Sequence, residues 1–252
     1  MLPTLLAFTL AFAPEPSAER LAKARADLKS ADVAVRKKAI ESLIHSDLSE
    51  HLFPEMVATL KDANGEVRSV AATAIGNLGV KSESAIPALV AQLQKDDTKE
   101  ARETAARALG RIGKAAPKNR SQVKPLQAAA AEDADPVTRT VARGALAMMD
   151  EDVPGQVKAL RKFLHHEEAL VRMKAAHALG MIGLPAKEAA PEIVTVLEKE
   201  TDGHRRGYIA RSLGNTGDPA SLAALKKALA AETYEGAKGE IRGAIQKLGD
   251  KP

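Results

Sequence analysis

The amino-acid sequence repeats one pattern at nearly regular intervals. When the copies are aligned, an arginine fills the same column in six of them, namely Arg36, Arg68, Arg102, Arg139, Arg172 and Arg206. Lys238 fills that column in a last copy, and successive members are 32 to 37 residues apart. Repeats of this length are typical of solenoids, in which a pair of helices stacks on the next pair. The sequence therefore predicts a repeat architecture.

Each copy begins with a predicted helix that carries the arginine in its first turn. Apolar residues follow three, seven and ten positions later, in the second copy Ala71, Ile75 and Leu78, so they share one helix face. In five copies an acid or amide that can cap the helix N-terminus stands four residues before the arginine. Most copies close with two glycines, such as Gly76 and Gly79, and the second is placed to end the helix.

A second predicted helix follows in each copy. Pro54, Pro87, Pro125 and Pro191 stand at or near its first turn, where proline removes no helical hydrogen bond. Two amphipathic helices cannot bury their apolar faces alone, so neighbouring copies must stack. We therefore expect an all-α fold, a right-handed α-solenoid of about six two-helix repeats with capping helices, forming one domain over residues 19–250.

The copy VRSVAATAIGNLG carries almost all of the pattern D-x-x-V-R-x-x-A-A-x-A-L-G-x-I-G. This pattern resembles the HEAT-repeat family, and within it the short HEAT-like units of the phycobilin-lyase type. The resemblance extends from Asp32 to Gly249. It implies a binding scaffold, in which the arginine column is a structural ladder of ion pairs or caps between neighbouring repeats.

The amino-acid composition excludes several kinds of site, and the N-terminal residues indicate where the protein resides. Cysteine and tryptophan are absent, which excludes disulfides, thiolate metal sites and cysteine nucleophiles. Residues 1–18 combine a short apolar run with small residues and a proline-rich change of character, and so resemble a secretory signal peptide. We expect an exported bacterial protein, periplasmic or extracellular. The alternative is a cytoplasmic protein whose N-terminal segment is not a signal peptide.

Catalytic chemistry finds little support in the sequence. His165, His166 and Glu167 form the cluster that could hint at a metal, but deoxyhypusine hydroxylases, which resemble HEAT proteins, use several His-Glu pairs on successive units. A single pair cannot supply such a ligand set. Tetrapyrrole binding, which the phycobilin-lyase resemblance raises, lacks aromatic stacking partners. We therefore expect no enzyme, no cofactor, no metal and no small-molecule substrate.

Two surfaces are candidates for binding a partner. We expect the exposed positions of the second helices to line the concave face, where a solenoid holds an extended protein partner; they include Gln92, Lys95, Gln127, Lys158, Lys162, Thr195, Lys199 and Lys227. The alternative is an anionic polymer or membrane surface bound at a basic edge around residues 107–124, which holds Arg107, Arg111, Lys114, Lys118, Arg120 and Lys124. We expect a monomer that binds another protein.

The fourth unit departs from the pattern. Ala147 and Asp150 replace its two glycines, and Met148 and Met149 stand where the other copies carry other residues. Because the stability of a solenoid is close to a sum over neighbouring units, a poor unit sets where the stack opens. The sequence predicts that point at the fourth unit.

Overall fold

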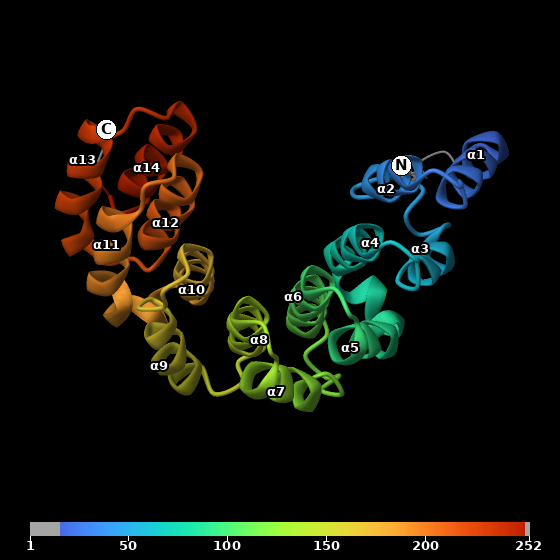
Figure 1. The fold of residues 1–252 in the computed structure, drawn as a ribbon, viewed down its shortest axis with the longest axis horizontal. Helices are drawn as coiled ribbons and strands as arrows, with labels where there is room; N and C mark the ends of the chain where they lie inside the picture. The colour runs from blue at the N-terminus through green and yellow to red at the C-terminus, as the bar shows by residue number, and fades with distance from the viewer. Residues whose placement is uncertain (1–15, 250–252) are drawn as a thin grey trace, which may run out of the picture.

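The computed structural model describes residues 16–249, and this range folds into fourteen α-helices joined by loops and short 3₁₀ turns. The helices form two layers that follow one arc (Figure 1). The outer, convex layer consists of α1 (Ala18–Leu28), α3 (Phe53–Thr59), α5 (Ile86–Lys95), α7 (Val123–Glu132), α9 (Val153–Phe163), α11 (Ala190–Lys199) and α13 (Leu222–Ala231). The inner, concave layer consists of α2 (Val33–Ser42), α4 (Gly65–Asn77), α6 (Lys99–Ala115), α8 (Pro136–Met148), α10 (Ala169–Ile182), α12 (Gly203–Asn215) and α14 (Glu235–Lys247).

The predicted all-α solenoid is confirmed. Six units run from the pair α2 and α3 to the pair α12 and α13, and α1 and α14 lie at the two ends. Most of the predicted leader, residues 1–15, lies outside the described residues. Helix α1 begins at Ala18, and the side chain of Ser17 accepts a hydrogen bond from the backbone N–H of Arg20 at 3.3 Å.

The assignment of the concave face to the second helices is wrong. The first helices of the units, together with α14, line the hollow of the arc, and the second helices form its outer layer (Figure 1). The physical reason is helix spacing. A Cβ atom built on Gly110 of α6 would lie 2.7 Å from Cβ of Ala145 in α8, and one on Gly76 of α4 would lie 2.8 Å from Cβ of Ala108 in α6. Backbones that approach this closely occupy the short side of a bend.

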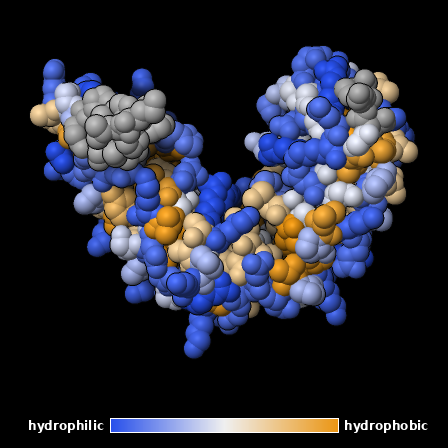
Figure 2. Space-filling model, turned by 180° about the vertical axis from the view of Figure 1, so that it is seen from behind, coloured by the Kyte–Doolittle hydropathy of each residue, from blue (hydrophilic) through white to orange (hydrophobic). Residues whose placement is uncertain are grey.

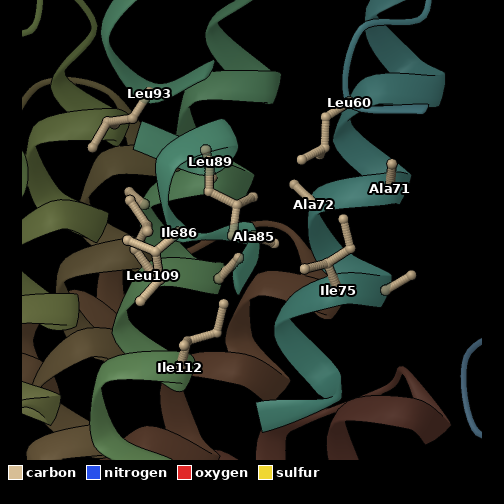
Figure 3. Close-up of a cluster of buried hydrophobic side chains, with 14 of the residues drawn as sticks. Leu60, Ala71, Ala72, Ile75, Ala85, Ile86, Leu89, Leu93, Leu109 and Ile112 are labelled. Atoms are coloured by element: carbon tan, nitrogen blue, oxygen red, sulfur yellow. The ribbon is translucent and has the colours of Figure 1, made fainter. Parts of the chain in front are cut away.

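Larger side chains fill the space between the layers. In the unit shown in Figure 3, Ile86 and Leu89 of α5 lie beside Leu109 and Ile112 of α6, and all four are buried. Ile75 of α4 extends this cluster toward the preceding unit. Successive inner helices therefore meet through glycine and alanine, while leucine and isoleucine separate the outer layer from the inner one, so the stack curves toward the inner layer.

The helix ends follow the predicted pattern with one exception. Gly79 and Gly183 have φ of +59° and +76°, the left-handed region that glycine enters without steric cost, and each follows the end of its inner helix. Gly113 does not end α6, which continues to Ala115. In the fourth unit Asp150 takes the glycine position with φ of +60°.

Candidate functional site

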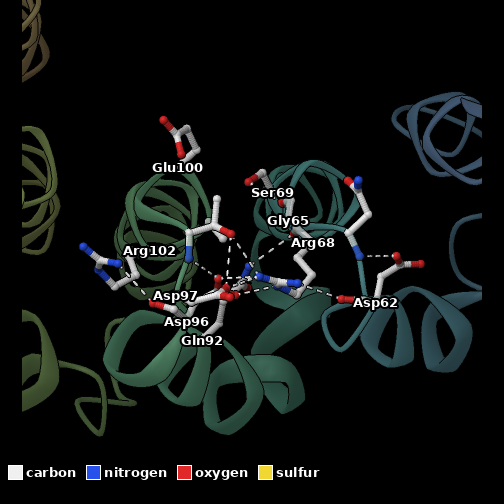
Figure 4. A network of polar contacts seen from close by, with 12 residues as sticks. Asp62, Gly65, Arg68, Ser69, Gln92, Asp96, Asp97, Glu100 and Arg102 are labelled. Carbon is white, nitrogen blue, oxygen red and sulfur yellow. Dashed lines mark hydrogen bonds and ion pairs between the residues drawn. The ribbon is translucent and has the colours of Figure 1, made fainter. Parts of the chain in front are cut away.

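The arginine column forms a ladder along the stack, seen for one unit in Figure 4. Arg68 donates through Nε and Nη2 to the carboxylate of Asp96, in the loop from α5 to the next unit, both at 2.7 Å, and through Nη1 to the carbonyl oxygen of Asp62 at 2.9 Å. Asp96 in turn accepts the backbone N–H of Thr98 at 2.9 Å. The same pairing joins Arg36 to Asp62, Arg102 to Asp133 and Arg206 to Glu232. These four arginines connect each unit to the loop that leads into the next one.

The electrostatics agree with that role. The hydrogen bonds from Arg206 lower the pKa of Glu232 to about 2, although burial opposes the shift. The side chains of these pairs are largely covered, with Arg102 16% and Asp133 7% exposed. A bidentate pair in such a setting is stronger than an exposed surface ion pair. The ladder is therefore engaged in structure and is not free to bind a partner.

The ladder is interrupted at Arg139 and Arg172. Arg172 donates to the carbonyl oxygens of His166 and Glu167 at 2.8 and 2.6 Å and, within the described residues, forms no ion pair. Arg139 donates to the carbonyl oxygens of Asp133 and Ala134 at 2.6 and 3.2 Å, and within the described residues it forms no ion pair. The position where other units place the carboxylate holds His166, whose Nδ1 accepts the backbone N–H of Glu168 at 3.1 Å. His166 thus closes the loop as Asp96 does elsewhere, but it supplies no negative charge to Arg139.

The apolar core is interrupted at the same place. One buried cluster extends from Leu28 to Met149, and a second from Val157 to Ile245. Arg143 of α8 occupies the position that holds a buried alanine in α4, α6, α10 and α12. Its Nη1 lies 3.4 Å from Oε1 of Gln156, and its buried Nε has no hydrogen-bond partner. The fourth unit is therefore a joint between two separately packed halves.

The predicted concave-face residues lie on the convex layer. Gln92 of α5 is 5% exposed, and its Nε2 donates to the carbonyl oxygen of Arg68 at 3.3 Å. Lys158 and Lys162 are exposed on α9, and Lys227 of α13 forms an ion pair with Glu198 at 3.0 Å. Lys95, Gln127, Thr195 and Lys199 belong to α5, α7 and α11 of the same layer. The amphipathic pattern placed one face of each helix in the core but could not say which layer was inner.

The cations of the predicted basic edge are divided among several settings. Lys114 and Arg120 line a cavity of about 600 Å³ where α6, α8 and α10 end. Arg120 forms an ion pair with Glu151 and also donates to the carbonyl oxygen of Met149 at 2.9 Å. Lys118 is exposed in the loop before α7, and Lys124 is exposed in the first turn of α7. Arg107 and Arg111 belong to the inner helix α6.

A different constellation lies on the concave face, where α6, α8 and α10 are adjacent. A cavity of about 140 Å³ opens there, and we call it the notch; its lining is Arg107, Arg111, Val141, Gly144, Ala145, Met148, Lys174, His177, Ala178 and Met181. The notch exists because α8 carries Gly144 where the neighbouring helices carry Arg107 and His177, so a side chain is missing in the middle. In Figure 2 hydrophobic surface interrupts the hydrophilic surface at the floor of the hollow.

A salt bridge across the notch joins two inner helices that are not neighbours in the stack. Nζ of Lys174 in α10 lies 2.5 Å from Oε1 of Glu103 in α6, although α8 lies between these helices. Arg107 forms an ion pair with the same carboxylate. Glu103 is therefore shared by two cations, and the rim of the notch keeps a positive balance.

Arg111 and His177 of the notch are surrounded by positively charged side chains. Arg111 donates to Oδ1 of Asn77 and within the described residues forms no ion pair. Burial is the main cause that lowers the pKa of Arg111, and the positive charge of Arg107 lowers this pKa further. Burial also lowers the pKa of His177 to about 4, and the positive charges of Arg211, Arg107, Lys174 and Arg111 add to the shift. His177 is therefore neutral near pH 7 and sits in a positive field.

A methionine of the notch and a tyrosine of the next inner helix are exposed on the concave layer. Met181 is 45% exposed on α10, and Tyr208 is 46% exposed on α12, where the guanidinium of Arg211 lies 4.7 Å from the centre of its ring. Sequence reasoning missed Lys174, His177 and Arg211. A signal was present, because Arg107, His177 and Arg211 all stand five residues after the ladder arginine of their copy.

Among residues 16–249, no group of three or more His, Asp or Glu side chains is placed to hold a metal ion. His166 lies against the ring of Phe163, with the ring centres 6.4 Å apart. No helix in the same range is both long and apolar enough to cross a membrane.

The fold and its repeated ladder define an α-solenoid of two-helix units. Comparison with protein families identifies the units: HEAT repeats match residues 53–147, 123–207 and 157–246. This chain belongs to the HEAT-repeat family. The match does not extend to the narrower phycobilin-lyase type. No curated protein matches the sequence.

Several solved structures resemble the fold at low sequence identity. Human deoxyhypusine hydroxylase in complex with glycerol is 20% identical, with 91% of this chain and 96% of that chain covered and a TM-score of 0.42. An engineered protein is 23% identical, with 92% and 69% covered and a TM-score of 0.47. Designed armadillo repeat proteins for modular peptide recognition are 19% identical, with 91% and 100% covered and a TM-score of 0.39.

Proposed function

We propose that this protein is a non-enzymatic scaffold that binds another protein through its concave face. The observation that carries the proposal is the notch, with Met181 exposed in its lining, together with the exposed Tyr208 on the next inner helix, α12. Arginine and aromatic residues next to a pocket are typical of the residues that dominate protein interfaces. The inner layer combines these features on adjacent helices of one continuous surface.

The ion pairs of the ladder and the exposed residues of the outer layer also favour the concave face as the binding surface. Four of the ladder arginines are held in ion pairs between repeats. Among the exposed charged residues of the outer helices, lysines such as Lys158 and Lys162 are the most frequent, and lysine is depleted in interface cores. The surface suited to a specific partner is therefore the inner one.

Site-specific photo-crosslinking in host cells tests this proposal. A benzophenone amino acid replaces Tyr208 on the concave face in one variant and Lys158 on the convex face in another. We expect discrete protein adducts from position 208 and none from position 158. Adducts from position 158 alone would move the binding surface to the convex layer. The absence of protein adducts from both positions would contradict the scaffold function.

Binding of an anionic polymer at the basic edge is the second candidate. Lys114 and Arg120 line one cavity, although Arg120 is already paired with Glu151. This function predicts affinity for heparin or polyphosphate that falls steeply with salt, and loss of that affinity when Lys114, Lys118, Arg120 and Lys124 are neutralised together. A scaffold that uses the concave face would keep its partner in that variant.

Export is proposed on the character of residues 1–18. The intact mass of the protein recovered from its host, measured with the cell fraction that contains it, tests this. We expect loss of the first eleven or thirteen residues in an envelope or secreted fraction, because small residues precede those positions. A full-length protein in the cytosol would contradict export.

A further inference from the structure

We propose that the notch binds an extended acidic peptide segment of a partner, with one aliphatic side chain seated over Gly144 and carboxylates on either side paired with Arg111 and Lys174. This inference rests on the proposed scaffold function and names the chemistry of its partner. It is carried by the shape of the cavity, the apolar character of its lining and the charges of its rim.

The cavity has the size and lining for one side chain. Its volume is about 140 Å³, and its apolar lining combines the small residues Gly144, Ala145 and Ala178 with the larger Val141, Met148 and Met181. Apolar cavities of roughly 150 Å³ hold a six-carbon ring, so an aliphatic side chain such as leucine is accommodated. A Cβ on Gly144 would already lie 3.0 Å from Cβ of Ala178, so α8 and α10 approach each other closely at this point of the lining.

The rim selects negative charge. Arg107 and Lys174 share the carboxylate of Glu103, and Arg111 contributes a further positive charge that no carboxylate of the described residues neutralises. Arg211 stands beyond His177 on the next helix, 3.3 Å from Oε1 of Glu240. A ligand carboxylate at Arg111 would relieve the repulsion that Arg107 exerts there. Charge complementarity of this kind selects partners by sign.

The form of the surface favours a peptide over a lipid surface or a single-stranded nucleic acid. Helices α6, α8 and α10, which line the notch, lie at the bottom of the arc between its two arms (Figure 1), and the space-filling view shows a hollow between these arms (Figure 2), which a flat bilayer surface cannot enter. Single-stranded nucleic acids are held by stacking on aromatic side chains, and the lining of the notch offers only the half-buried ring of His177. An extended chain can follow the concave face and present alternate side chains to it.

A fluorescein-labelled peptide, Gly-Asp-Asp-Leu-Asp-Asp-Gly, tests the inference by fluorescence anisotropy with the full chain. Comparison peptides replace leucine by serine, or all aspartates by lysine. The main variant is Arg111→Gln, which removes an unpaired cation and keeps a polar group beside Asn77. The control Lys158→Gln removes the same charge from the convex face. Circular dichroism and the unfolding midpoint establish that both variants fold.

We expect the leucine peptide to bind, and Arg111→Gln to weaken it about tenfold or more while Lys158→Gln changes it less than twofold. Met181→Ser, at an exposed wall position, is the second variant. Replacing leucine by serine in the peptide should cost much more with the wild type than with Met181→Ser, because the two changes remove the same contact. That coupling identifies the notch itself and does not depend on Arg111→Gln being folded.

Four outcomes overturn the inference. One is that the lysine peptide binds as tightly as the aspartate peptide, and another is that both Gln variants weaken binding equally. The third is that polyuridylate or phosphatidylglycerol vesicles bind more tightly than the peptide and lose binding in Arg111→Gln, which would reassign the notch to another anion. Adducts at position 208 with no binding of the acidic peptide would leave the scaffold function standing and refute only the peptide chemistry.

Discussion

Replacing Gly110 by alanine should destabilise the solenoid, although the same change in an ordinary helix stabilises it. The added Cβ would lie 2.7 Å from Cβ and 2.8 Å from Cα of Ala145. Carbon atoms in contact are normally about 3.5 to 4.0 Å apart, so α6 and α8 would have to separate by about 0.8 Å or more. Overpacking of this kind costs about 1 to 3 kcal/mol. The higher helix propensity of alanine returns about 1 kcal/mol.

Gly243 provides the matched control, because it also lies within a helix, α14, and a Cβ built there meets nothing within 4 Å. Gly243→Ala should therefore raise the free energy of unfolding by up to about 1 kcal/mol. The difference between the two variants cancels the propensity and isolates the close approach, at about 1 to 3 kcal/mol. Urea unfolding followed by circular dichroism measures both, with hydrogen exchange to localise the effect to α6 and α8. Equal stabilisation by the two substitutions would refute the spacing argument.

The remaining predictions concern the ladder, the joint and the notch. A double-mutant cycle on Arg102 and Asp133, measured by urea unfolding, should give a coupling free energy of about 1 to 2 kcal/mol, and a value near zero would remove the ladder from the stabilising contacts. Arg143→Met should stabilise the chain by about 1 kcal/mol or more. We expect low hydrogen-exchange protection at α8 and α9 in the wild type, and this substitution should raise it. If wild-type α8 and α9 are as well protected as the best protected helices, the fourth unit is not a joint. His177 has a folded pKa of about 4 against an ordinary value of 6.5, so the unfolded chain binds the proton first and the free energy of unfolding should fall as pH drops from 6.5 to 4. His177→Gln should lose that part of the pH dependence, and an unchanged profile would show that the imidazole is not held neutral.

Local patterns in the sequence were sufficient for the units and their fastening. A helix N-cap such as Asp135, a proline in the first turn and apolar residues on one face act within a few residues of one another, so they can be read without a tertiary structure. The ladder followed from its period, since an arginine that recurs with each unit can meet an equivalent neighbour, and four of the six arginines do so. Arg139 escaped this reasoning because His166 stands where the partner should be, and a histidine in a loop gives no sign of a missing carboxylate.

The candidate site was largely beyond the sequence. Lys174 and Glu103 are 71 residues apart, and only the curvature of the inner layer brings their charges to 2.5 Å. The notch depends on a side chain that Gly144 lacks, which becomes a cavity only when Arg107 and His177 stand on either side. Reading the copies column by column reveals that these residues are equivalent, but it does not reveal that their column faces the hollow.

The sequence by itself determined that this chain is a stack of two-helix repeats, because helix periodicity and the repeat length depend only on residues close together in the chain. The tertiary structure alone decided which layer is concave. Both helices of a unit are amphipathic, and the choice between them depends on how closely successive units approach each other. That distance is set by glycine and alanine contacts such as Gly110 with Ala145, between helices about one repeat apart in sequence. The curvature, the notch and its positive rim all follow from that packing.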